Sequence, residues 1–166
     1  MIIYIGSDHQ GFKTKELLRE FLKDKGYGVV DVGNLQYDEQ DDYPDYAEAV
    51  ARRVSRDTDN SRGVLVCGSG VGVSIVANKF KNIRAALIFS PDHAFDAKND
   101  DDINILAIAA KYTDPTVAKK ILVAWLETPF SGEEKHRRRL QKISEIEAKI
   151  EETIKREAGE ESIINE

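Results

Sequence analysis

Residues 63–79 run GVLVCGSGVGVSIVANK. The β-branched run ends in a turn with glycine at every second position, at Gly68, Gly70 and Gly72, and a helix-compatible segment follows. This order predicts a buried strand, a tight loop and the N-terminus of a helix. Glycines let the backbone turn sharply and present consecutive N–H groups, which together with the helix dipole favour an oxyanion or a phosphate.

The only cysteine of the chain, Cys67, stands at the end of this predicted strand. Amides and a helix N-terminus favour the thiolate form of a cysteine, so we expect Cys67 to be a base beside an anion-binding loop. Packing as a small hydrophobic residue is the alternative role. The pattern G-x-G-x-G differs from the G-x-G-x-x-G of dinucleotide sites, and the stretch lacks the G-K-[ST] of a P-loop, so neither nucleotide site is indicated.

The length and the charge of the chain limit the classes of protein it can belong to. Its 166 residues are enough for one well-buried core, and its net charge of -6 with 33% charged residues indicates no surface for nucleic acid. A single cysteine excludes an intramolecular disulfide framework, no apolar run approaches the length that spans a membrane, and the N-terminus runs directly into a strand. We therefore expect one cytoplasmic domain without a membrane or nucleic-acid partner.

Strand-like and helix-like segments alternate along the first 127 residues. Strands are predicted at 2–5, 29–33, 63–67, 84–89 and 105–108, and helices at 13–25, 43–56, after the glycine loop, at 92–98 and at 115–127. Continuous apolar strands between helices indicate a parallel sheet that is covered on both faces. In such a sheet the loops at the carboxyl ends of the strands form the site.

The end of the chain differs from the rest, because it predicts one long charged helix at about 133–157. Its apolar residues recur at spacings of three or four: Leu140, Ile143, Ile146, Ile150 and Ile154. Such a narrow stripe is expected to pack on another helix, and its position after a complete fold favours a second subunit over its own core. We expect a single domain at 1–158 that forms a homodimer, followed by a flexible tail at 159–166.

Several separated motifs within residues 2–150 carry a resemblance to a known family: Gly6-Ser7-Asp8-His9-x-Gly11, Asp42-Tyr43-Pro44-x-Tyr46-Ala47, Val66-Cys67-Gly68-Ser69-Gly70-Val71-Gly72, Ala77-Asn78-Lys79, Ile83-Arg84-Ala85, Asn104-Ile105-Leu106 and His136-x-x-Arg139. Together they resemble the ribose-5-phosphate isomerase B and galactose-6-phosphate isomerase family. The resemblance implies an α/β three-layer sandwich with a five-stranded parallel flavodoxin-like sheet and a long C-terminal helix. It also implies a homodimer, or a dimer of dimers, in which each site uses residues of both subunits.

The same resemblance implies the reaction, an aldose–ketose isomerisation of a phosphorylated sugar without cofactor or metal. Ribose 5-phosphate and ribulose 5-phosphate are the expected substrate pair, with an enediolate between them. Cys67 resembles the family's catalytic base. The loop would hold the enediolate oxygen through the amides of residues 68–72, that is Gly68, Gly70, Val71 and Gly72, with Ser69 in place of the threonine common there.

The resemblance also assigns residues to the sugar and to its phosphate group. Asp8 and His9 resemble residues that contact the sugar and the phosphate, and Tyr43 is expected to line the pocket. The expected phosphate contacts are Lys111, Lys135, His136 and Arg139. Arginine is more usual at the two lysine positions, and lysine keeps the charge but loses the bidentate fork.

The sequence departs from the family where a ring-opening histidine is expected, because residues 99–102 read NDDD. One hypothesis is that Asp100, kept protonated beside Asp101, serves as the acid, since neighbouring carboxylates raise one another's pKa. Another is that His93, about two helical turns earlier, replaces it. The run is also typical of a solvated turn, and three adjacent carboxylates rarely converge on a metal.

Three functional classes stay open at this point. The first is the isomerase of a pentose or hexose phosphate. The second is a non-catalytic relative that binds a sugar phosphate or a nucleotide without converting it. The third is an isomerase of an open-chain phosphorylated substrate, for which a ring-opening acid is unnecessary.

Overall fold

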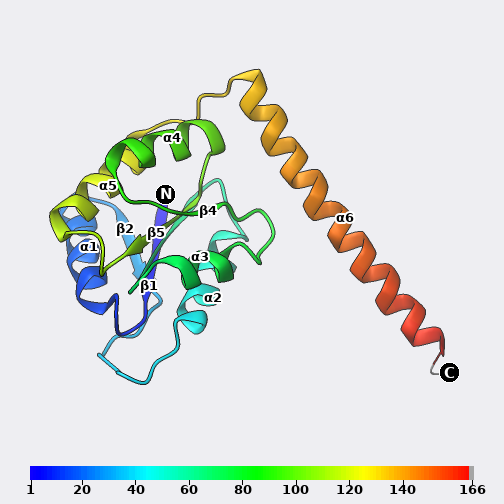
Figure 1. Cartoon of the computed structure of the whole chain (residues 1–166), viewed down its shortest axis with the longest axis horizontal. Coiled ribbons are helices and arrows are strands. Elements are labelled where there is room, and N and C mark those ends of the chain that lie inside the picture. The colour runs from blue at the N-terminus through cyan, green and yellow to red at the C-terminus, as the bar shows by residue number, and fades with distance from the viewer. Residues whose placement is uncertain (165–166) are drawn as a thin grey trace. The chain divides into compact units, whose positions relative to one another are not determined.

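A parallel sheet forms the centre of the first part of the chain (Figure 1). The computed structural model describes residues 1–164, with side chains as far as residue 158. Within these residues the sheet has five strands in the order β2-β1-β3-β5-β4, namely β1 (Ile2–Ser7), β2 (Gly28–Asp31), β3 (Ser61–Cys67), β4 (Ala85–Leu87) and β5 (Ile105–Ala109). All pairings are parallel, which confirms the predicted sheet.

Helices cover both faces of this sheet and make the fold a three-layer α/β sandwich of the flavodoxin-like type. The helices up to residue 130 are α1 (Phe12–Asp24), α2 (Tyr43–Val54), α3 (Val71–Ala77), α4 (Pro91–Asp101) and α5 (Pro115–Glu127). One buried cluster joins the sheet to α1, α4 and α5, and a second joins it to α2 and α3. The predicted fold class is therefore confirmed.

The side chains of β3 alternate between these two clusters. Val64 and Val66 pack with α1, α4 and α5, whereas Leu65 and Cys67 pack with α2 and α3. This is the two-residue period of a strand whose two faces are both covered. It places the Cys67 side chain on the face of the sheet that carries α2 and α3.

Short polar caps begin two of the helices. The Ser90 hydroxyl accepts a hydrogen bond from the amide of His93 at 3.1 Å, and the Asp114 carboxylate accepts one from the amide of Thr116 at 2.7 Å. A proline stands in the first turn of each of these helices. Because a side-chain oxygen satisfies an amide that has no partner within the helix, these sites start helices locally.

The predicted acidic turn at residues 99–102 is wrong, because α4 continues to Asp101. Asp102 then ends the helix in the left-handed conformation, with φ of 46°. Its carboxylate pairs with Lys98 and with Arg84, whose Nη2 lies 2.9 Å from Oδ2. Neutralising the charge at the helix C-terminus lets the helix extend further than the acidic residues suggested.

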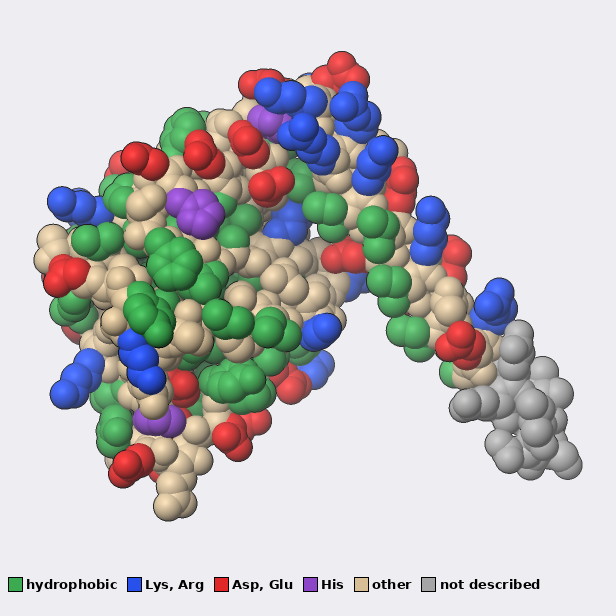
Figure 2. All heavy atoms as spheres, in the orientation of Figure 1, with side chains coloured by type: hydrophobic (Ala, Val, Ile, Leu, Met, Phe, Trp, Pro, Cys, Tyr) green, Lys and Arg blue, Asp and Glu red, His purple; other side chains and the backbone are tan. Residues whose placement is uncertain are grey.

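The chain divides into two compact units, Met1–Phe130 and Ser131–Glu166. The second consists mainly of α6 (Glu134–Ile164), a single long helix. Figure 2 shows hydrophobic side chains along one side of α6, and Ile143, Ile146, Ile150 and Ile154 are 41–60% exposed. The single domain at 1–158 stays a prediction, and so does the flexible tail at 159–166: the backbone is helical to Ile164, and residues 165–166 lie outside the described residues.

No helix within residues 1–164 is both long enough and apolar enough to cross a membrane.

Candidate active site

Two loops meet at the carboxyl edge of the sheet, where β1 and β3 lie side by side. The chain leaves β1 toward β2 on one side and later returns as β3 on the other, so this point is a topological switch point. The loop after β1 lies directly against β3, because a Cβ on Gly11 would come within 2.3 Å of the carbonyl oxygen of Val66. Ligands bind in open α/β sheets at such crevices.

Cys67 ends β3 with its sulfur directed at the glycine loop. The amide of Gly70 donates a hydrogen bond to Sγ at 3.0 Å, and the residue is only 4% exposed. Gly70 has φ of 74°, and a Cβ there would lie 2.3 Å from Leu87 Cδ1. The left-handed turn that aims this amide at the sulfur therefore depends on glycine. The side chain of Cys67 belongs to an apolar cluster and its sulfur also accepts an amide hydrogen bond.

The remaining residues of the loop present backbone amides beside this sulfur. Val71 and Gly72 lie in the first turn of α3, where amides have no carbonyl partner within the helix. Ser69 is exposed, and its hydroxyl accepts a hydrogen bond from the Val71 amide at 3.4 Å. The loop thus combines a thiol, a hydroxyl and helix-terminal amides.

Two predicted side chains lie against the loop from other elements. The amide of Lys111, just after β5, donates to the carbonyl of Gly68 at 3.0 Å, and a Cβ on Gly68 would lie 3.1 Å from Lys111 Cε. A Cβ on Gly72 would lie 2.6 Å from the ring of Tyr43. The structure therefore places a cationic side chain and a phenol ring next to the loop.

Asp8 and His9 follow β1 at the same edge. The carboxylate of Asp8 accepts a hydrogen bond from the amide of Gly11 at 2.9 Å, and burial raises the pKa of Asp8 above its ordinary value. The ring Nδ1 of His9 lies 2.7 Å from the carboxylate of Asp41, and the His9 amide donates to the same oxygen at 2.8 Å. This side-chain hydrogen bond raises the pKa of His9, although desolvation opposes it. Asp41 therefore favours the cationic form of His9.

The sequence reasoning did not single out Asp41, which lies in the polar loop between β2 and α2. Burial acts to raise its pKa, but the hydrogen bonds from His9 and from Asn34 prevail, so the pKa of Asp41 is lowered. The buried ammonium of Lys15 holds this loop by donating to the carbonyl of Asn34 at 3.0 Å, and it also pairs with Asp31. The feature of the sequence that could have pointed to Asp41 is the acidic composition of residues 34–42.

Asp100 and Asp101 lie at the opposite edge of the sheet from Cys67. They end α4, which leads into the start of β5, and Ile105 at that start pairs with Gly63 rather than with Cys67. Cys67 pairs with Ala109, at the far end of β5. His93, in contrast, begins α4 after β4 and lies at the carboxyl edge. A single copy of the sheet therefore brings neither aspartate to the thiol.

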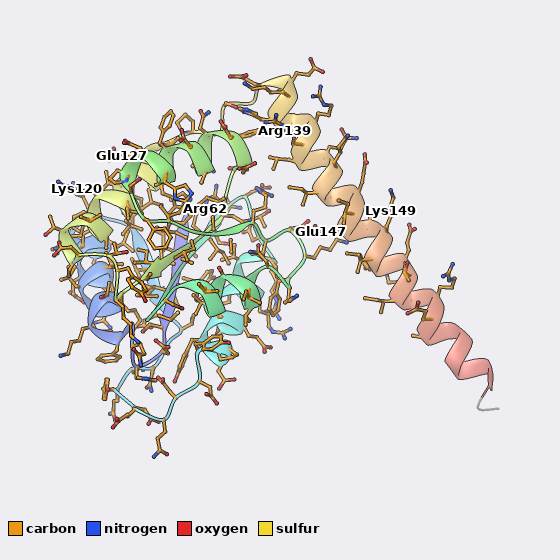
Figure 3. The ribbon with its side chains drawn as sticks, viewed as in Figure 1. Arg62, Lys120, Glu127, Arg139, Glu147 and Lys149 are labelled. Carbon is orange, nitrogen blue, oxygen red and sulfur yellow. The ribbon has the colours of Figure 1, made fainter. Side chains whose placement is uncertain are left out.

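The predicted phosphate contacts near the C-terminus lie in the second unit. Lys135 and Arg139 are four residues apart on α6 and share one face, and Figure 3 labels Arg139. His136 is buried, with its Nδ1 2.6 Å from the Ser131 hydroxyl, and Lys135 pairs with Glu133 at 3.0 Å. This face of α6 thus offers two cations in one turn.

A thiol, helix-terminal amides and a cationic histidine at one switch point suit the chemistry of a small anionic substrate. Fixed amides can stabilise a developing negative charge without reorganising. The class of protein defined by this fold and edge is an enzyme whose substrate carries an anionic group.

Comparison with known proteins identifies the family. The model of the Ribose/Galactose Isomerase family matches residues 3–143. The chain is 40% identical over 149 residues to the probable ribose-5-phosphate isomerase B of Mycoplasma genitalium, covering 90% of this chain and 97% of that one. It is 38% identical over 145 residues to ribose-5-phosphate isomerase B of Escherichia coli, covering 87% and 95%.

Solved structures agree with the sequence comparison. The ribose-5-phosphate isomerase B of Mycoplasma genitalium with bound ribulose-5-phosphate superposes with a TM-score of 0.86 at 39% identity, covering 89% of this chain and 96% of that one. The enzyme of Clostridium thermocellum gives 0.85 at 40% identity, covering 90% and 99%. The chain belongs to the ribose/galactose isomerase family. The predicted family and the predicted class of enzyme, an aldose–ketose isomerase, are confirmed.

Proposed function

We propose that this enzyme interconverts ribose 5-phosphate and ribulose 5-phosphate, with Cys67 as the base and an enediolate as the intermediate. The observation that carries the proposal is the hydrogen bond of 3.0 Å from the Gly70 amide to the Cys67 sulfur. It supports a sulfur held beside amide donors that can also hold an oxyanion. The substrate is inferred from the relative that was solved with ribulose-5-phosphate bound.

The proposed reaction moves one proton between neighbouring carbons. The Cys67 thiolate takes the proton from the carbon next to the aldehyde, and the electron pair of that C–H bond forms the double bond of the enediolate. The amides of Gly70, Val71 and Gly72, with the Ser69 hydroxyl, stabilise the negative oxygen. The Cys67 thiol then returns its proton to the former carbonyl carbon, and a proton passes between the two oxygens. The reaction needs no redox cofactor and no metal.

The substrate contacts are proposed from the same edge and from a second copy. Asp8, His9, Tyr43, Gly68 and Lys111 would bind the sugar and its phosphate group. A partner copy would add Lys135, His136 and Arg139. Together with Lys111, the site would then have four cationic or titratable side chains. The exposed isoleucines of α6 support a homodimer, because apolar stripes of this kind are stable when they pack on another surface.

Ring opening is proposed to use Asp100 with Asp101, and a partner copy would have to supply both, since they end α4 at the amino edge. His93 is the alternative acid from the carboxyl edge. A second candidate function, the isomerisation of an open-chain phosphorylated sugar, is favoured by the aspartate at the position of the family's ring-opening histidine, because such a substrate needs no ring opening. A cytoplasmic location stays part of the proposal, and the single cysteine supports it.

Solvent exchange at carbon tests the proposed base. The Cys67→Ala variant is incubated with ribose 5-phosphate or an open-chain analogue in deuterium oxide, and both turnover and deuterium incorporation are measured. Loss of a positioned base is expected to lower both by about 10²- to 10⁴-fold while binding of the sugar phosphate persists. Val76→Ala, which trims a side chain packed on the same apolar cluster, is the matched control and is expected to keep its activity. Unchanged exchange in Cys67→Ala would remove Cys67 from the mechanism.

A further inference from the structure

A pocket of about 340 Å³ lies at the amino edge of the sheet, away from Cys67. Its walls combine cationic and apolar side chains from the start of β3, the end of α4 and the end of α5: Met1, Arg62, Lys98, Asp102, Trp125, Leu126, Thr128, Pro129 and Phe130. The volume falls within the range of small-molecule sites. Nothing in the proposed isomerase chemistry uses these residues.

Positive charge exceeds negative charge around this pocket. Lys98 is only 10% exposed in its side chain and pairs with Asp102, and Arg84 binds the same carboxylate at 2.9 Å. Arg62 makes no ion pair among residues 1–158, so its charge adds to theirs. Burial lowers the pKa of Lys98, and the charges of Arg62 and Arg84 lower it further while Asp102 raises it. Two cations thus pair with one carboxylate, and Arg62 adds a third positive charge.

Arg62 is held in place by its own backbone neighbours and keeps free donors. Its Nη1 donates to the carbonyls of Thr58 at 2.6 Å and Ser61 at 2.7 Å, and Figure 3 labels the residue. These bonds occupy one nitrogen of the guanidinium, whereas Nε and Nη2 bond to none of the described residues. A guanidinium that is anchored at one end loses little entropy when it binds an anion with the other.

The other wall of the pocket is apolar. Trp125 borders the pocket but is only 1% exposed, and its indole N–H donates to the carbonyl of Ile103 at 3.1 Å, so it offers no donor to a ligand. Pro129 and Phe130 form the apolar surface after the end of α5. A ligand that fits both walls has an anionic head and an apolar body.

We propose that this pocket binds a small organic anion whose phosphate or carboxylate group is held by Arg62 and Lys98 and whose apolar body lies against Pro129 and Phe130, next to the buried Trp125. The pocket is separate from the proposed role of Asp100. Lys98 and Asp100 are two residues apart on α4, so their side chains point about 200° apart around the helix. The site therefore stands whether or not the proposed isomerase mechanism is correct.

Fluorescence of Trp125 tests the site directly, because it is the only tryptophan of the chain. Phenyl phosphate is titrated into the full-length protein, with phenol as the uncharged analogue. A saturable change with phenyl phosphate and none with phenol is expected. Lys111→Gln, which removes a proposed phosphate contact at the Cys67 edge, is expected to give the same titration curve if the signal comes from this pocket.

Variants of Arg62 identify the group that binds the anion. Arg62→Gln removes the charge and is expected to weaken the binding of phenyl phosphate by about tenfold. This is the loss of affinity typical of one charge-assisted contact. Arg62→Lys keeps the charge and is expected to bind more tightly than Arg62→Gln, which separates charge from a folding defect. Arg56→Gln, at an exposed arginine that does not line the pocket, is the matched control and is expected to match the wild type.

Three results would overturn the proposal. The first is no saturable change with phenyl phosphate at millimolar concentration. The second is an equal response to phenol, which would indicate a merely apolar pocket. The third is wild-type affinity in a folded Arg62→Gln protein, with folding checked by circular dichroism.

Discussion

The two edges of the sheet present different kinds of group to an anion. At the carboxyl edge, backbone amides of the glycine loop surround the Cys67 sulfur, and the cationic form of His9 is favoured by Asp41. At the amino edge, the cations are side chains, and Asp102 binds two of them at the end of α4. The first edge offers fixed dipoles, whereas the second offers charged side chains, of which Lys98 and Arg84 already pair with Asp102.

This difference explains which edge suits catalysis. Amides in a tight loop are oriented before the substrate arrives, so they stabilise a charge that develops in the transition state at little cost in reorganisation. Lysine and arginine side chains must instead exchange one partner for another. Asp102 therefore serves the structure by ending α4, and the excess charge of Arg62 and Lys98 is suited to binding rather than to proton transfer.

Mixing two inactive variants tests whether the carboxyl edge of one copy and the amino edge of another form one active site. Of all the predictions, it has the largest expected effect on turnover. Cys67→Ala lacks the proposed base and Asp100→Asn the proposed acid, so each homodimer is expected to be inactive. A mixed dimer with shared sites has one doubly altered site and one intact site. Random exchange makes about half of the dimers mixed, so about a quarter of wild-type turnover is expected to return.

The matched control mixes two variants of the same edge. Cys67→Ala and His9→Ala each alter a proposed site residue at the same edge of one chain, so mixing them is expected to add nothing to the turnover of the two separate proteins. Turnover is measured with ribose 5-phosphate after exchange of subunits, and light scattering reports the assembly. If mixing Cys67→Ala with Asp100→Asn restores no turnover, the aspartates are not part of the active site.

Local signals in the sequence predicted most of the fold and the centre of the site. The strand, glycine loop and helix at residues 61–77 depend on neighbours along the chain, and the Asp114 cap does too. The extension of α4 was missed because it depends on Arg84, which is distant in sequence from Asp102. Asp41 was missed for the same reason, since it meets His9 across 32 residues. Charge pairs between distant segments leave no periodic signal.

Asp41→Asn removes the carboxylate that stabilises the cationic form of His9 at the carboxyl edge. The hydrogen bond to Asp41 raises the pKa of His9, so the variant is expected to have a lower pKa at His9 and less cation at neutral pH. The alkaline limb of kcat/KM is expected to move to lower pH, with KM about two- to tenfold higher at neutral pH. NMR titration of the imidazole measures the pKa, and Glu39→Gln in the same loop is the control.

The same pair makes stability depend on pH in a definite direction. Because the folded state raises the pKa of His9, the pair stabilises the fold fully below the ordinary histidine pKa, and its contribution is lost as the pH rises through the raised value. Urea unfolding at several pH values should show this slope in the wild type and a flatter one in Asp41→Asn. Equal slopes in both proteins would contradict the assignment of the raised pKa to Asp41.

Asp102→Asn alters the amino edge and has the smallest expected effect on stability. Asparagine tolerates the left-handed conformation at φ of 46°, so the substitution removes charge without straining the backbone. Loss of the ion pairs is expected to lower the free energy of unfolding by about 1–2 kcal/mol in urea, whereas Asp96→Asn on the exposed side of α4 is expected to change it by less than about 0.5 kcal/mol.

The same variant is expected to bind phenyl phosphate more tightly, because the carboxylate that competes for Lys98 is gone. A loss of stability together with a gain of affinity would separate the two roles of this charge cluster: Asp102 pairs the cations for the fold, and an incoming anion replaces it as their partner. If affinity instead fell with stability, the cations would depend on Asp102 for their position, and the pocket would have to bind its anion through Arg62 alone.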